Sequence, residues 1–250
     1  MNRKLILISC DNGGHGYLPG VTVDMANYNH FFRSAIGGAW MDSEIRRYDN
    51  ITRETLHQYI VMTEGDRHVD YWLIVFCGHG HVDFNNNTQM ILTVNNEISE
   101  LDIFTWVTTS RCLLISDCCR EVQRLHENRQ NQEVVIEEGI NLDNVTYRDA
   151  YNDFLRQVPS GTHCSAFSAS IGESAGDNGA VGGIYSYNLL NNARRLGREQ
   201  LVNQEVQHPL MISFEEVHNN TSHPVEIMTN NDQHPICRGN IDRIPFVVIA

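Results

Sequence analysis

Two adjacent cysteines follow an apolar stretch near the middle of the chain. The stretch Cys112–Ser116 has the composition of a buried parallel strand, and Cys118 and Cys119 come shortly after it. A second apolar stretch, Tyr71–Phe76, is followed in the same way by His79. In an open α/β sheet, ligands and chemistry gather at the carboxyl ends of the strands. The pattern therefore predicts a thiol and an imidazole at one edge of a sheet.

A thiol and an imidazole placed together are typical of nucleophilic catalysis. Cys119 is the candidate nucleophile, and His79 is the candidate base that takes the thiol proton and later protonates the leaving amine. The backbone N–H groups of Gly80 and Cys119 are candidates to stabilise a tetrahedral oxyanion. The alternative is a buried structural cysteine beside a histidine in a turn. Two strand-end motifs in this order favour the catalytic interpretation.

Cys118 has three possible roles. The Cys118-Cys119 pair is compatible with a redox switch or with a site for a soft metal. Neighbouring side chains on a strand point to opposite faces, however, so we expect Cys118 to face the core.

Strands and helices alternate along the chain, which predicts the α/β class with a largely parallel sheet covered on both faces. The predicted strands are 5–8, 44–48, 71–76, 90–94, 112–116, 162–170, 224–228 and 244–249. The predicted helices are 20–36, one capped by Thr52, one that begins with a capping box at Ser99, 147–158, one from 184 to about 195, and a short one near Glu215. A glycine-rich loop at 11–16 lacks the lysine or glycine spacing of a phosphate-binding loop.

Composition limits the class of protein and of partner. The 250 residues are 41% hydrophobic, which is enough for a single domain spanning 1–250. The formal net charge of −13 disfavours nucleic acid and anionic membranes as partners, although it would attract a basic peptide or only aid solubility. The apolar run near the N-terminus is too short for a signal peptide, so we expect a cytoplasmic protein. Seven cysteines without zinc-site spacing are expected to be reduced.

Several of these motifs resemble those of the caspase and metacaspase superfamily of cysteine peptidases. Phe76–Gly80 resembles the family's strand followed by Gly-His-Gly, and Ile115–Arg120 resembles the metacaspase segment around the nucleophile. The weaker similarities are Leu18–Gly20 with Asp24, Ser168–Ser170, Gly183–Ser186, Gln233–Pro235 and Pro245–Val247. The resemblance implies a caspase-like three-layer α/β/α sandwich around about six mainly parallel strands, with His79 and Cys119 as the catalytic pair.

The chain also departs from the metacaspase pattern. Arg120 and Glu121 replace the His-Ser that follows the metacaspase cysteine, and Val21 stands where metacaspases usually have Cys. The resemblance divides the chain into a large-subunit-like part (1–123), a polar loop (124–146) and a small-subunit-like part (147–250).

The resemblance also implies a substrate preference. Asp117 and Asp24 match the acids of the primary pocket, and Ser168 is a further substrate-binding candidate. Two carboxylates favour a substrate Arg or Lys and repel Asp. Asp24 is equally compatible with a purely structural role at a helix start.

The polar segment suggests modes of regulation. Arg124 and Arg129 are candidate autocleavage sites, and Glu137, Glu138 and Asp143 are acids that would attract calcium without forming an EF-hand loop. We therefore expect no required cofactor and no metal site. The sequence leaves the activating partner or small-molecule signal and the oligomeric state open.

Three functions are compatible with these features. The favoured one is a cysteine endopeptidase, a hydrolase acting as a regulated effector in signalling, cell death or antiviral defence. The second is a catalytically inactive caspase-fold interaction or scaffold module, and the third is a thiol redox or metal-binding protein.

Overall fold

A six-stranded sheet forms the centre of the molecule. A computed structural model describes residues 1–121, 143–202 and 209–250. The strand order is β12-β8-β7-β3-β1-β2, and only β12 runs antiparallel to its neighbour. The strands are β1 (Arg3–Cys10), β2 (Ile45–Asp49), β3 (Tyr71–Gly78), β7 (Arg111–Asp117), β8 (His163–Phe167) and β12 (Ile236–Arg238). The predicted α/β class with a mainly parallel sheet is confirmed.

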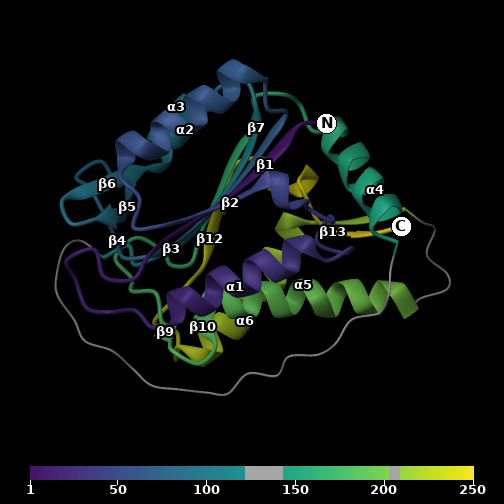
Figure 1. Ribbon diagram of the computed structural model, residues 1–250. Helices are drawn as coiled ribbons and strands as arrows, with labels where there is room; N and C mark the ends of the chain where they lie inside the picture. The colour runs from purple at the N-terminus through teal and green to yellow at the C-terminus, as the bar shows by residue number, and fades with distance from the viewer. Residues whose placement is uncertain (122–142, 203–208) are drawn as a thin grey trace.

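Helices cover both faces of this sheet, as shown in Figure 1. Alternate residues of β1 belong to two separate apolar cores: Leu5 and Leu7 to one, Ile6 and Ile8 to the other. The first core is covered by α1 (Gly20–Arg33), α4 (Asn144–Gln157), α5 (Ile184–Val202) and α6 (Phe214–Met228). The second is covered by α2 (Arg53–Asp66) and α3 (Glu100–Trp106). The result is the expected three-layer α/β/α sandwich.

Three small antiparallel sheets complete the fold. They are formed by β4 (Gly80–Val82), β5 (Thr88–Thr93) and β6 (Asn96–Ser99); by β9 (Asp177–Asn178) and β10 (Gly182–Gly183); and by β11 (Leu210–Ser213) and β13 (Pro245–Ile249). Short 3₁₀ turns lie at Asp42–Glu44 and Ile241–Arg243. The predicted strand at 90–94 belongs to the first of these sheets, and the predicted strand at 244–249 belongs to the last.

The predicted helix starts are present as capping hydrogen bonds. The Ser99 hydroxyl accepts the Asp102 N–H (3.1 Å), and the Asp102 carboxylate accepts the Ser99 N–H (3.0 Å). The Thr52 hydroxyl accepts the Thr55 N–H (3.3 Å) at the start of α2. Helix α4 begins at Asn144, three residues before the predicted helix and inside the predicted polar loop.

The strand predicted at 224–228 is wrong, because these residues form the end of α6. Pro224 lacks an N–H and therefore leaves the carbonyl of Asn220 without its helical partner. The side chain of Asn192, on α5, donates to this carbonyl instead (3.1 Å). Val217, Thr221 and Val225 are buried at a helical spacing of four residues. A tertiary contact thus compensates for the helical hydrogen bond that the proline removes.

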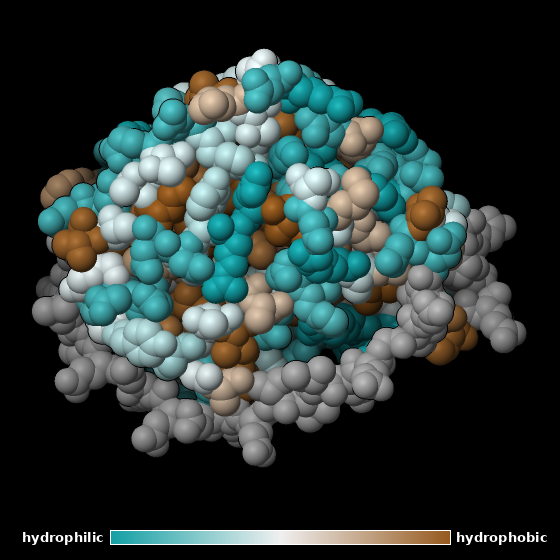
Figure 2. Space-filling view, viewed as in Figure 1, coloured by the Kyte–Doolittle hydropathy of each residue, from teal (hydrophilic) through white to brown (hydrophobic). Residues whose placement is uncertain are grey.

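The viewed face of the molecule is mainly hydrophilic, with apolar side chains scattered over it (Figure 2). Among the described helices, none is long and apolar enough to cross a membrane.

Candidate active site

The sheet brings His79 and Cys119 to neighbouring strand ends. Strands β3 and β7 pair in parallel, with Cys77 opposite Asp117. His79 lies two residues after the first of these, and Cys119 lies two residues after the second. Neighbouring strands are about 4.8 Å apart. The register therefore places the imidazole and the thiol at the same edge, as the sequence predicts.

His79 is oriented by the backbone of the glycine-rich loop. Its Nε2 lies 2.6 Å from the carbonyl oxygen of Gly16. A carbonyl only accepts, so Nε2 carries the hydrogen and Nδ1 keeps its lone pair. Burial lowers the pKa of His79, and the nearby His15 lowers it further. The imidazole is thus neutral near pH 7 and able to act as a base. The sequence showed this loop but gave no signal that its carbonyl orients the histidine.

Cys119 is held by a different loop. The N–H of Ala175 donates to the Cys119 Sγ at 3.3 Å. Burial raises the pKa of Cys119 above its ordinary value, and the carboxylates of Glu121 and Asp117 raise it further. The thiol is therefore protonated in this state. The described hydrogen bonds of the two side chains go to Gly16 and Ala175, and none joins His79 directly to Cys119.

Gln233 anchors the loop that carries Ala175. This side chain is buried, its Oε1 accepts the Gly176 N–H (2.9 Å), and its Nε2 donates to the Ser168 carbonyl (2.8 Å). Gln233 thereby fixes the segment over the candidate nucleophile. The sequence analysis included Gln233 among the weaker similarities to the family, but only the tertiary structure shows its contact with this loop.

Cys118 faces the core, as predicted. It is 1% exposed, and its Sγ lies 3.2 Å from the Ser116 hydroxyl. Burial raises the pKa of Cys118 to about 12. Gly80 packs directly on it, since a Cβ at Gly80 would lie 2.5 Å from the Cys118 Sγ. The core thiol therefore sets the position of the backbone next to His79.

The two predicted pocket acids are buried at the N-terminal end of α5. Both carboxylate oxygens of Asp24 accept the Gly183 N–H (3.0 and 2.9 Å). Asp117 accepts from the Ser186 N–H (3.0 Å) and from the Ser186 hydroxyl (2.6 Å). Burial raises the pKa of both acids. Within the described residues, neither carboxylate forms an ion pair with Lys or Arg.

Asp177 is a third acid near this pair, and the sequence reasoning missed it. Its carboxylate accepts the Gly20 N–H at the start of α1 (3.2 Å). It contributes to the raised pKa of Asp24, after burial and Asp117. Its position in a short hairpin, β9–β10, gave no sequence signal.

Ser168 contacts the backbone of the nucleophile segment. Its hydroxyl accepts the Cys118 N–H (3.1 Å) and lies 3.2 Å from the Cys118 carbonyl, to which it donates. The side chain is fully buried. In this state Ser168 fixes the end of β7.

Arg120, where the chain departs from the metacaspase pattern, is fully buried. Its Nε donates to the Thr88 hydroxyl (2.8 Å), and its Nη1 donates to the Ala169 carbonyl (3.1 Å). The guanidinium lies 4.3 Å from the centre of the Phe167 ring. Arg120, the residue after Cys119, therefore links β5 to the loop after β8 through hydrogen bonds.

Some predicted regulatory residues lie outside the described part of the chain. These are Arg124, Arg129, Glu137 and Glu138. Asp143 is described, and its side chain caps α4 by accepting the Val145 N–H (3.1 Å). No group of three His, Cys, Asp or Glu side chains in the described segments is arranged to hold a metal ion.

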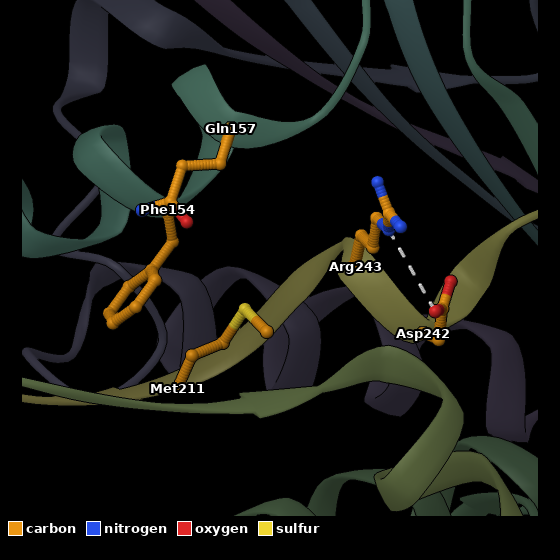
Figure 3. A pocket seen from close by; sticks show the side chains of 5 residues that line it. All are labelled: Phe154, Gln157, Met211, Asp242 and Arg243. Atoms are coloured by element: carbon orange, nitrogen blue, oxygen red, sulfur yellow. Dashed lines mark ion pairs between the residues drawn. The ribbon is translucent and has the colours of Figure 1, made fainter.

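Two cavities lie away from this site. One, of about 240 Å³, lies between α4, β11 and the turn at Ile241–Arg243, where Asp242 and Arg243 form an ion pair (Figure 3). The other, of about 250 Å³, is lined by Trp40 and Arg148 among others. Neither is lined by His79 or Cys119.

The sandwich, with a thiol and an imidazole at neighbouring strand ends, has the architecture of a caspase-like peptidase domain. The comparison with known families agrees: the chain belongs to the caspase-domain family, whose sequence model matches residues 2–243. No individual curated protein matches the chain. At this coarse level the family supports a caspase-like peptidase domain and implies protein substrates.

Proposed function

We propose that the protein is a cysteine endopeptidase that uses His79 and Cys119 to cleave peptide bonds after Arg or Lys. The observation that carries this proposal is the parallel register of β3 and β7, because His79 and Cys119 each lie two residues beyond the last paired position of these neighbouring strands. The Gly16 hydrogen bond supports it, because it leaves His79 Nδ1 as the basic nitrogen.

The proposed reaction has two stages. His79 Nδ1 takes the thiol proton as Cys119 Sγ attacks the scissile carbonyl carbon, and the N–H groups of Gly80 and Cys119 stabilise the oxyanion. The C–N bond breaks, His79 gives the proton to the leaving amine, and a thioester remains. Water then attacks the thioester and gives a proton to His79, which returns it to Sγ as the new carboxylic acid leaves.

The acid cluster supports the preference for a basic residue before the scissile bond. Asp24 and Asp117 are buried acids without a described cationic partner, and Asp177 is a third acid nearby. A substrate guanidinium or ammonium group favours the ionised form of these acids and offsets the cost of burying it. A substrate Asp increases that cost. Ser168 contributes in this proposal by holding the backbone at Cys118, the residue after Asp117.

Fluorogenic peptide amides ending in Arg, Lys or Asp test this function. We expect the wild type to release the fluorophore from the Arg and Lys peptides only, and Cys119→Ala to release none. Asp117→Ala should remove cleavage after Arg while iodoacetamide still modifies Cys119. Undiminished cleavage after Arg in this variant contradicts the pocket assignment.

A scaffold module without activity is the second candidate. The observation in its favour is that Cys119 hydrogen-bonds to Ala175 and not to His79. The same peptides distinguish the two functions, since a scaffold cleaves none of them. Autocleavage at Arg124 or Arg129 remains a proposal, and it is tested by mass spectrometry of wild type and Cys119→Ala after incubation.

A further inference from the structure

Two large apolar side chains are exposed on the backbone segments that hydrogen-bond to His79. Tyr17 directly follows Gly16, whose carbonyl accepts the Nε2 hydrogen of His79, and it is 58% exposed. Val94 lies three residues after Ile91, whose N–H donates to the His79 carbonyl (3.0 Å), and it is 62% exposed. Isolated exposed apolar residues are common. These two differ because each lies on a segment whose backbone hydrogen-bonds to the candidate catalytic histidine.

The segment that carries Tyr17 packs against the segment that carries Val94, so the backbone at both residues is held in place by tertiary contacts. A Cβ at Gly14 would lie 3.3 Å from Val94 Cγ2, and a Cβ at Gly13 would lie 2.7 Å from Ile91 Cγ2. The loop after β1 is also closed on itself by the hydrogen bond from Leu18 N to the Asp11 carbonyl (2.8 Å). Figure 1 shows this loop near β4 and β5. A ligand that contacts such a surface loses little free energy to ordering it.

The chemistry of cleavage determines which part of a substrate passes this surface. His79 protonates the leaving amine, so the residue after the scissile bond lies next to His79 when the bond breaks. The basic residue before the bond lies towards Asp24 and Asp117, which bind the N-terminal end of α5. Tyr17 and Val94, which lie on the segments that hydrogen-bond to His79, are therefore on the leaving-group side.

We infer that Tyr17 and Val94 recognise an apolar side chain in the first two substrate residues after the scissile bond. This inference rests on the proposed endopeptidase function. Covering exposed apolar surface on both partners favours such a substrate over one with a polar or charged side chain there. The protein then selects two features of its substrate: a cation before the bond and an apolar group after it.

Internally quenched peptides test the inference. All share an Arg before the scissile bond and carry either Leu or Ser at the two positions after it. In the wild type we expect kcat/KM to be about tenfold higher or more for the Leu peptide. In the double variant Tyr17→Ser, Val94→Ser this ratio should fall to within about twofold. Val61→Ser is the matched control, since Val61 is 47% exposed on α2 and should keep the wild-type ratio.

A fluorogenic Arg amide, which has no residue after the scissile bond, separates the possible failures. If the wild type cleaves this amide but does not prefer the Leu peptide, the inference is overturned and the proposed function stands. The inference is also overturned if Val61→Ser lowers the ratio as much as the double variant does. If the wild type cleaves neither the amide nor the peptides, the proposed function and the inference fall together.

Discussion

Cys118 and Cys119 are chemically identical neighbours that follow the end of β7, and their environments differ. Cys118 is 1% exposed and packs under Gly80, whereas the Sγ of Cys119 meets the N–H of Ala175 at the sheet edge. This difference favours the second thiol as the proposed nucleophile.

This difference predicts the effects of replacing each cysteine. Cys119→Ala should lower kcat/KM by about 10³-fold or more, because no other nucleophile occupies its place. Cys118→Ala should keep most of the activity and lose about 1–2 kcal/mol of unfolding free energy, because a buried group is removed. Peptide hydrolysis and urea unfolding of both variants measure this. Equal loss of activity in the two variants would contradict the assignment of the nucleophile.

The environment of His79 predicts the acid side of the pH profile. Burial lowers the pKa of His79 below 6.5, and the imidazole is a base only when it is neutral. The value of kcat/KM should therefore fall, as the pH is lowered, at a midpoint below pH 6.5. His15→Ala removes a neighbour that lowers this pKa, so the midpoint should move to higher pH. A midpoint that stays in place or moves down would show that His79 does not control this limb.

At the scale of elements, backbone atoms from two loops and from the start of β4 contribute to the candidate site. The carbonyl of Gly16, the N–H of Ala175 and the backbone of Gly80 all act through main-chain groups. Adding a side chain at such a position should affect activity only where the added atoms would clash with their neighbours.

Gly80 follows His79 in the chain, and Gly16 hydrogen-bonds to its side chain. These two glycines should respond differently to substitution by alanine. A Cβ at Gly80 would lie 2.5 Å from Cys118 Sγ and 2.9 Å from the Gln89 carbonyl, whereas a Cβ at Gly16 meets nothing within 4 Å. Gly80→Ala should displace the strand end and lower kcat/KM by about 10²-fold. Gly16→Ala should keep its carbonyl in place and stay within about twofold of wild type. Steady-state kinetics check both, and the reverse order would refute this description of the site.

At the scale of the whole molecule, the net charge of −13 acts on substrates before they reach the site. A negative field attracts basic peptides and is screened by salt. Raising the ionic strength from about 0.05 M to about 0.5 M should therefore raise KM for a peptide with extra lysines more than for one with extra serines. The kinetics of the two peptides at each salt concentration test this. An equal change for both peptides would show that the long-range charge has no effect on binding.

The sequence by itself determined which residues end the strands. The apolar runs before His79 and Cys119 and the alternation of strands with helices predicted a largely parallel sheet covered on both faces and the edge of that sheet at which both residues lie. These features are local, because they depend on hydrophobic pattern and on which face a side chain takes. The same local reasoning predicted a strand at the end of α6, where Asn192 of another helix satisfies the Asn220 carbonyl that Pro224 leaves without its helical partner.

Only the tertiary structure decided how the site is held. Gly16 lies 63 residues from His79 in the chain, Ala175 lies 56 from Cys119, and Arg120 reaches Ala169 across 49. Asp177 comes close to Asp24 only through the short hairpin β9–β10. Hydrogen bonds of this kind cannot be recognised from the periodicity of the sequence. They depend on which loops come together in the folded protein and not on the pattern of any one segment.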